Sequence, residues 1–109
     1  MAPRQFGHFE QTLLYAVLRL QDEDGGANGP AIRALIRTHT GRLVSPGALY
    51  TALTRLEDRG YVTSELGEPT PERGGKRKRH YRMRPAGQAA LRVAEANLAR
   101  MAGFARAKS

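Results

Sequence analysis

Cysteine and tryptophan are both missing from this sequence of 109 residues. Without cysteine the chain can form no disulfide and offers no thiolate, so a disulfide framework and a cysteine nucleophile are excluded. Acidic residues are scarce too, because 10 Asp and Glu stand against 18 Lys and Arg and leave a formal charge of +8. This excess of positive charge favours a polyanionic partner, either nucleic acid or an anionic membrane surface.

Long apolar runs are also lacking. No stretch approaches the ~20 apolar residues that cross a bilayer, and the N-terminus has no apolar segment of the kind found in signal peptides. We therefore expect a soluble, cytoplasmic protein with no membrane partner.

Residues for catalysis do not occur together as a set. His8, His39 and His80 fall in different predicted elements, and none has the spacing of a metal site. No glycine-rich loop joins a strand to a helix, so the pattern of a nucleotide site is absent as well. The sequence therefore predicts that the protein is not an enzyme and has no metal site and no cofactor.

Hydrophobic periodicity predicts four helices, with a pair of strands between the third and the fourth. The length suits one domain, and an apolar fraction of 40% is enough for a small core. The helices are predicted from about His8 to Gln21, from Asn28 or Gly29 to Gly41, from Ser45 to Gly60, and from Pro85 to about Phe104. The expected fold class is mostly α with a two-stranded β-hairpin.

The second and third predicted helices form a helix-turn-helix pattern. Ser45 can cap the third helix, because its side-chain oxygen can accept a free backbone N–H. Pro46 suits the first turn, because proline has no N–H that would need a partner there. Only a tight turn fits between Gly41 and Ser45. Two helices joined this closely are typical of DNA-binding proteins.

The outward face of the third helix carries predicted DNA contacts. If Leu49, Leu53 and Leu56 face the core, small residues, hydroxyl groups and one arginine face outward and can reach base edges or phosphates. The predicted contacts are Ser45, Gly47, Thr51, Thr54 and Arg55. The acidic residues Glu57 and Asp58 repel phosphates, which indicates that the end of the helix leaves the DNA. The alternative is an ordinary amphipathic helix in which Ser45 is only a cap.

A basic hairpin, here called the wing, follows the third helix. Apolar and polar residues alternate over 61–66 and 79–84, which predicts two strands, while 67–78 is rich in glycine, proline and charge and predicts a long tip. The predicted wing contacts are Arg73, Lys76, Arg77, Lys78 and Arg79. Phosphates would relieve the repulsion among these charges, so nucleic-acid binding should weaken steeply with salt. The alternative is a solvated basic loop.

The last predicted helix has an apolar seam suited to self-association. Its apolar residues are spaced three and four apart, as in paired helices, and the first helix shows more apolar surface than one neighbour covers. The residues expected at a dimer interface are Leu14, Leu18, Leu91, Ala94, Leu98 and Met101. Packing of the last helix on the first within one chain is the alternative, and both can hold.

Several blocks of the sequence together resemble the PadR family of transcriptional regulators. They are Phe9–Leu18, Gly29–Arg33, Ser45–Val62, Gly67–Arg82 and Pro85–Gly87, and the most specific segments read Ser-Pro-Gly-Ala-Leu-Tyr and Arg-Gly-Gly-Lys-Arg-Lys-Arg. The resemblance implies a winged helix-turn-helix fold, a homodimer built through the first and last helices, and repression by operator binding. It also implies DNA contacts by Tyr50, by Arg55 and by the wing residues Lys76 to Arg79.

The resemblance extends to regulation and has two departures. Some members bind flat aromatic effectors at the dimer interface, which implies a small-molecule effector as a further partner. Only one helix fits after Pro85, so the chain is similar to the short members of the family. Asn28 stands where many members have an aromatic residue. Arg84 stands where many have Thr or Ser, so the last helix lacks a predicted cap.

Taken together, these patterns predict a winged helix-turn-helix DNA-binding domain over residues 1–84 and a dimerisation helix over residues 85–109. The predicted function is sequence-specific regulation of transcription by a repressor whose homodimer binds double-stranded DNA at a pseudo-palindromic operator. Two alternatives stay open at this point. One is a sequence-neutral architectural protein that binds DNA or RNA, and the other is a protein-interaction module whose wing only aids solubility.

Overall fold

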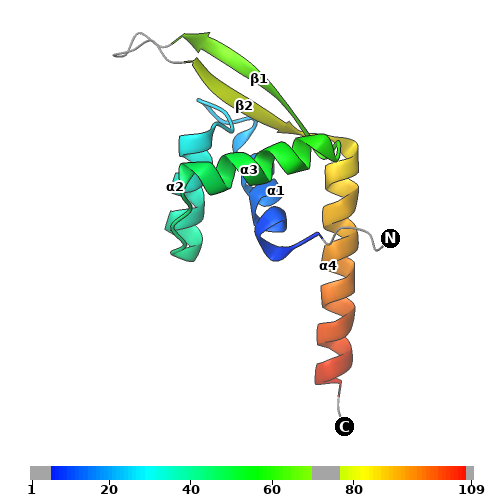
Figure 1. Ribbon diagram of the computed structural model, residues 1–109. Coiled ribbons are helices and arrows are strands. Elements are labelled where there is room, and N and C mark those ends of the chain that lie inside the picture. The colour runs from blue at the N-terminus through cyan, green and yellow to red at the C-terminus, as the bar shows by residue number, and fades with distance from the viewer. Residues whose placement is uncertain (1–5, 70–76, 108–109) are drawn as a thin grey trace.

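Four helices and one antiparallel hairpin make up the computed structural model, which describes residues 6–69 and 77–107 (Figure 1). In chain order the elements are α1 (His8–Leu20), α2 (Gly29–Thr40), α3 (Pro46–Asp58), β1 (Val62–Pro69), β2 (Arg77–Met83) and α4 (Pro85–Arg106). This arrangement confirms the predicted winged helix-turn-helix, mostly α with a two-stranded hairpin. In the described ranges, no helix combines the length and the apolar character that a membrane span needs.

Side chains near the helix starts fix where α2 and α3 begin. Asn28 Oδ1 accepts the backbone N–H of Ala31 at 3.0 Å, and Ser45 Oγ accepts that of Ala48 at 3.1 Å. Each bond satisfies a backbone donor that has no partner inside the helix. The predicted cap at Ser45 is confirmed, and Asn28 turns out to be the cap of α2. Arg84 gives α4 no side-chain cap, as its residue type predicted.

The core lies between the first three helices and the base of the hairpin. The inward-facing leucines predicted for α3 are buried there, and Leu53 is only 1% exposed. Its members are Leu13, Leu14, Ala16, Val17, Ala27, Ile32, Ile36, Val44, Leu49, Ala52, Leu53, Leu56, Val62, Tyr81 and Leu91. Burying one large aliphatic side chain contributes about 1.5–3 kcal/mol, so the inner face of α3 is firmly held against the core.

The hairpin is longer than the sequence pattern predicted. Val62 lies opposite Met83 and Leu66 opposite Arg79, and the register then shifts before the next pair. The expected strands, 61–66 and 79–84, were therefore too short toward the tip, and residues 67–69, 77 and 78 belong to strands. Backbone hydrogen bonds hold the pairing, so it continues past the last alternating side chain. The shift in register accommodates the unequal strand ends.

The loop between α1 and α2 covers the outer edge of β2. The N–H of Tyr81 donates to the carbonyl oxygen of Ala27 at 3.0 Å, and Asn28 forms an isolated antiparallel bridge with His80. An uncovered strand edge would present free backbone groups to solvent. These contacts instead attach the base of the hairpin to the helical core.

The last helix leaves the other elements after its first turns (Figure 1). Gly87 lies against Tyr61, whose carbonyl oxygen would be 2.4 Å from a Cβ at that position, so a larger residue does not fit. Leu91 is buried, whereas Leu98 and Met101 are exposed. The apolar side chains in the C-terminal part of α4 are therefore largely uncovered by other residues of the described chain.

Candidate nucleic-acid interface

The outer face of α3 is open to solvent along its length. Gly47, Tyr50, Thr51 and Arg55 are exposed, and Tyr50 is 62% exposed. Thr54 is half-buried. Because the buried leucines hold the opposite face, the predicted contacts of α3 share one side of the helix. The exposed N-cap Ser45 stands at the start of this surface.

The turn between α2 and α3 is held by an arginine. Arg33 Nε donates to the carbonyl oxygen of Val44 at 2.7 Å, and Val44 is buried. Gly41 ends α2 with φ of +77°, a left-handed conformation that glycine adopts without steric cost. These contacts confirm the short turn predicted from Gly41 to Ser45 and set the position of α3 relative to α2.

Three of the five predicted wing contacts lie in β2. Arg77, Lys78 and Arg79 are exposed, whereas the predicted contacts Arg73 and Lys76 lie outside the described residues. The two arginines also bond within the hairpin. Arg77 Nε donates to the carbonyl oxygen of Gly67 at 2.8 Å, and Arg79 Nη1 donates to a serine hydroxyl on β1. Lys78 has no polar partner among the residues that the structure describes.

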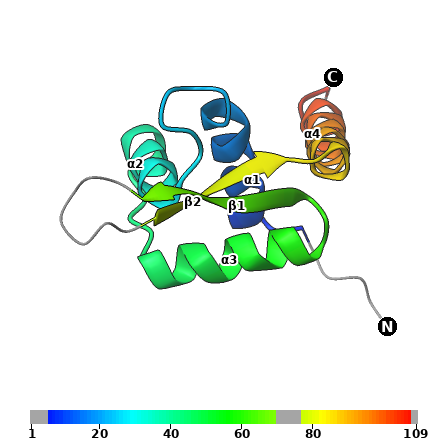
Figure 2. The same cartoon turned by 90° about the horizontal axis from the view of Figure 1, so that it is seen from above.

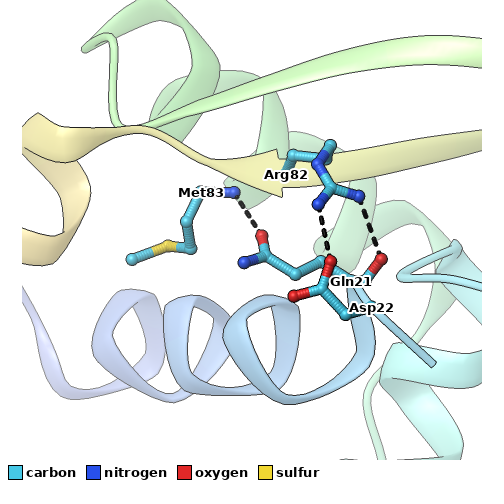
Figure 3. A network of polar contacts seen from close by, with 4 residues as sticks. All are labelled: Gln21, Asp22, Arg82 and Met83. Atoms are coloured by element: carbon cyan, nitrogen blue, oxygen red, sulfur yellow. Dashed lines mark hydrogen bonds and ion pairs between the residues drawn. The ribbon is translucent and has the colours of Figure 1, made fainter.

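A polar network joins the end of α1 to the base of the hairpin (Figure 3). Arg82 donates from Nη1 to the backbone oxygen of Gln21 at 3.0 Å and from Nη2 to Asp22 Oδ1 at 2.7 Å. Gln21 Oε1 accepts the N–H of Met83 at 2.8 Å. The three bonds fix how the hairpin leaves the core. They assign Arg82 an internal partner, although it is one of the basic residues of the wing segment.

Sequence reasoning missed this network. The adjacent acids of the α1–α2 loop favour a solvated turn, and Asp22 is indeed exposed while it pairs with Arg82. Opposite charge was the only available signal, because Asp22 and Arg82 are sixty residues apart in the chain. Only the folded arrangement brings the two side chains together.

His80 packs between the hairpin and the α1–α2 loop. A Cβ at Gly26 would lie 2.9 Å from His80 Nδ1, and a Cβ at Gly67 would lie 2.8 Å from His80 Nε2. The two glycines therefore leave room for the imidazole ring. Over the described ranges, no group of three or more potential metal-ligating side chains occurs. The His80 ring therefore packs between two backbone segments.

Two of the residues predicted for the dimer interface lie in the core of the chain. Leu14 is 0% exposed and Leu91 is 4% exposed, and both belong to the core of a single chain. Both side chains are already covered within one chain, so they offer little exposed surface to a second copy. The first helix turns Leu14 inward, and α4 uses Leu91 to attach to the core.

The other four predicted interface residues are accessible to differing degrees. Leu18 is 39% exposed, Leu98 65% and Met101 64%, whereas Ala94 is half-buried. Further exposed apolar side chains, which the seam pattern did not include, are Val93 and Phe104. An apolar surface of this kind on one helix is typical of an interaction site.

Tyr15 and Glu95 connect α1 to α4. The phenol hydroxyl of Tyr15 donates to Glu95 Oε2. Burial, followed by this hydrogen bond and the negative charge of Glu95, raises the pKa of Tyr15 to about 12. The hydroxyl therefore stays protonated around neutral pH, and the bond can restrain the direction of α4.

An open groove of about 610 Å³ lies beside α4. The rings of Phe6 and Tyr61 meet edge to face on one side of it, with centroids 5.6 Å apart. Small and apolar side chains of α4, among them Ala90 and Leu98, line the other side. The groove thus adjoins the exposed apolar surface of α4.

Comparison with known proteins identifies similar folds and sequences. The family model described as the transcriptional regulator PadR-like family matches residues 9–93. A PadR family transcription regulator from Clostridium difficile has a similar structure, with a TM-score of 0.69 and 17% identity, covering 90% of this chain and 94% of that one. Bacillus subtilis PadR, whose crystal structure is in complex with operator DNA, matches with a TM-score of 0.62 and 17% identity, over 78% of this chain and 45% of that one.

A curated relative has higher sequence identity. The chain is 38% identical over 80 residues to an uncharacterized 37.1 kDa protein in transposon TN4556 of Streptomyces fradiae. The match covers 73% of this chain but spans only 21% of that protein, about a fifth of its length. The likeness is therefore to one part of a longer protein.

Proposed function

The chain belongs to the PadR-like family of transcriptional regulators, and on this premise we propose that it represses transcription by binding a specific operator in double-stranded DNA as a homodimer. One observation carries the proposal. Helix α3 lies beside the hairpin (Figure 2). The open face of α3 carries hydroxyls and an arginine, and the second strand of the hairpin exposes three consecutive basic residues. A residue set of this kind suits base edges on α3 and phosphates on the hairpin.

In the proposed complex α3 enters the major groove with its N-terminal half. Gly47 lets the backbone approach the duplex closely, and Thr51 and Arg55 reach base edges. Ser45 and the start of the helix face a phosphate, and Lys78 contacts the backbone from the wing. The operator complex of the Bacillus subtilis relative supports this assignment to DNA.

The proposed dimer covers the apolar surface of α4 with a second copy of the chain. Leu18, Leu98 and Met101 supply exposed apolar area for this contact, with Ala94 beside them. A twofold particle would place two copies of α3 in successive major grooves about 34 Å apart, which requires a pseudo-palindromic site. A small-molecule effector held in the groove beside α4 would touch this interface and could shift the spacing of the two helices.

Selection of bound sequences from a random duplex pool tests the proposal. We expect the wild-type protein to enrich an inverted repeat. Thr51→Ala and Arg55→Ala should each change the preferred base at symmetric positions of that repeat, because each removes a base contact. Thr63→Ala, a matched change at an exposed threonine on β1, should leave the preferred sequence unchanged.

Three other outcomes would contradict parts of the proposal. Equal losses of affinity on the selected and on a scrambled duplex would remove the base-reading role of Thr51 and Arg55. Enrichment of no sequence would favour a sequence-neutral architectural protein. No duplex binding at moderate salt would favour a protein-interaction module.

A further inference from the structure

A chain of three polar side chains connects the last turn of α3 to the hairpin. Arg79 Nη1 donates to Ser64 Oγ at 3.0 Å. The same hydroxyl oxygen lies 3.0 and 2.9 Å from the two carboxylate oxygens of Glu57, to which it can donate. Ser64 therefore accepts from a cation and donates to an anion. Glu57 and Arg79 are coupled through this one hydroxyl.

The position of Glu57 is unfavourable for a carboxylate in an isolated helix. It lies in the last turn of α3, where free carbonyl groups give the helix end a partial negative charge. The first turn of α3, where a carboxylate would be stabilised, contains no acid. The hydrogen bond from Ser64 and the positive charge of Arg79 offset the repulsion at Glu57.

The buried Tyr81 lies within range of both charges at the junction of α3 and β2. Burial is the largest influence on its phenol and raises its pKa. The positive charge of Arg79 acts in the opposite direction and lowers the pKa, while the negative charge of Glu57 raises it. A single buried side chain thus lies within electrostatic range of both ends of the Glu57–Ser64–Arg79 chain.

Arg79 lies on the surface that we have proposed to face phosphates. A phosphate would compete with the Ser64 hydroxyl oxygen for the guanidinium of Arg79, because both offer oxygen atoms that accept its N–H groups. Each cation that pairs with a phosphate releases counterions and strengthens binding to DNA of any sequence. A guanidinium held by a hydrogen bond within the protein, with a carboxylate bonded to the same hydroxyl, contributes less to that release.

We propose that Glu57 limits sequence-independent DNA binding by holding Arg79, through Ser64, away from the phosphates. The inference rests on the proposed DNA-binding function. It makes Glu57 a specificity-determining residue that acts through Arg79 rather than by touching a base. The acid at the end of α3 then has a defined effect beyond a general repulsion of DNA.

The test measures binding to a short duplex of scrambled sequence over a series of salt concentrations. Glu57→Gln removes the charge but keeps the size of the side chain and an oxygen that can accept from Ser64. We expect the plot of log affinity against log salt to become steeper by about 0.9, which is a gain of roughly eightfold for each tenfold dilution of salt. Thermal unfolding of the same sample establishes that the variant is folded.

Two further variants separate the release of Arg79 from a simple change in charge. Glu23→Gln also adds one unit of net charge and should leave the slope unchanged. Glu23 lies on the α1–α2 loop and bonds to Arg19 at 2.7 Å. In the Glu57→Gln, Arg79→Ala double variant, the increase in slope caused by Glu57→Gln should disappear. If Glu57→Gln is unfolded, Ser64→Ala provides the test, because it breaks the link while leaving both charges and should steepen the slope in the same direction.

An unchanged slope in the folded Glu57→Gln variant, or a steeper slope that persists after Arg79→Ala, would overturn the inference. So would a slope in Glu23→Gln equal to that in Glu57→Gln. Failure of the proposed DNA binding would look different, because the wild-type protein itself would then bind no duplex.

Discussion

Helices α3 and α4 carry apolar residues at the same spacing, yet only α3 buries its whole stripe. On α3 the stripe of Leu49, Leu53 and Leu56 is at most 3% exposed. On α4 the stripe begins with the buried Leu91 and continues to Leu98, which is 65% exposed. The two helices therefore have similar patterns and different surroundings.

The difference shows that an apolar stripe predicts that one face of a helix is buried. It does not predict whether the residues that bury it belong to the same chain. Helix α3 lies across the core, so its stripe is satisfied within the chain and its polar face is free to contact a ligand. Helix α4 extends past the core (Figure 1), so its outer stripe has no cover within the described residues. One helix thus exposes a polar face, which we propose contacts DNA, and the other an apolar face, which we propose contacts a second copy.

The largest effect is expected from breaking the buried stripe of α3. Leu53→Ala should lower the free energy of unfolding by about 2–5 kcal/mol, because it leaves a cavity in a closely packed core. Chemical denaturation monitored by circular dichroism measures this change. A loss below about 1 kcal/mol would contradict the view that core burial holds α3 in place.

The next effect is expected at the exposed stripe of α4. Leu98→Asp should weaken self-association by at least about tenfold, since it would bury a charge against an apolar partner surface. Sedimentation over a range of protein concentrations measures it. The monomer should keep its fold, because Leu98 makes little of its contact within the chain.

Ala96→Asp is the matched control for this helix. Ala96 is exposed and lies on the side of α4 away from the stripe, so the same aspartate there should leave the association unchanged. Equal weakening by both substitutions would point to a general charge effect and contradict the proposed interface.

The smallest effect is expected at the contact between α1 and α4. Tyr15→Phe removes the hydrogen bond to Glu95 and should lower the free energy of unfolding by about 0.5 kcal/mol at neutral pH, a low value because the bond is exposed. The pKa of Tyr15 is raised from 10.0 to about 12, so folding favours the protonated phenol. The stabilisation of the folded state by the protonated phenol is complete below pH 10 and is lost as the pH rises through 12.

The stability difference between the wild type and Tyr15→Phe should therefore shrink over that alkaline range. Paired denaturation curves at neutral and alkaline pH measure the difference, and the absorbance of tyrosinate gives the titration itself. Equal stabilities at neutral pH, or a difference that stays constant up to pH 12, would show that the bond does not restrain α4.

Local signals in the sequence were enough to predict the helix-turn-helix. Ser45 satisfies a donor only three residues away, and Gly41 ends the preceding helix by its own backbone conformation. Such interactions depend on neighbours in the chain, so they can be read without the fold. The strand ends were predicted less well, because side-chain alternation stops before the backbone pairing does.

The candidate site was predicted in part. The exposed face of α3 and the basic strand β2 follow from pattern and charge, whereas the links from Arg82 to Asp22 and from Arg79 to Glu57 through Ser64 do not. The same limit applies to Leu14 and Leu91, which the sequence pattern placed at a dimer interface and the structure places in the core. A leucine on an amphipathic helix faces some apolar neighbour, and its position in the sequence does not say whether that neighbour is in the same chain.

The sequence by itself determined the order of the elements, the caps of α2 and α3, the inward leucines of α3 and the positive charge of the hairpin. These features arise from contacts within a few residues or from composition. The tertiary structure alone decided which apolar side chains remain exposed and which charges of distant segments are paired. Both outcomes depend on distances between segments that are far apart in the chain, and these distances are set only when the core packs.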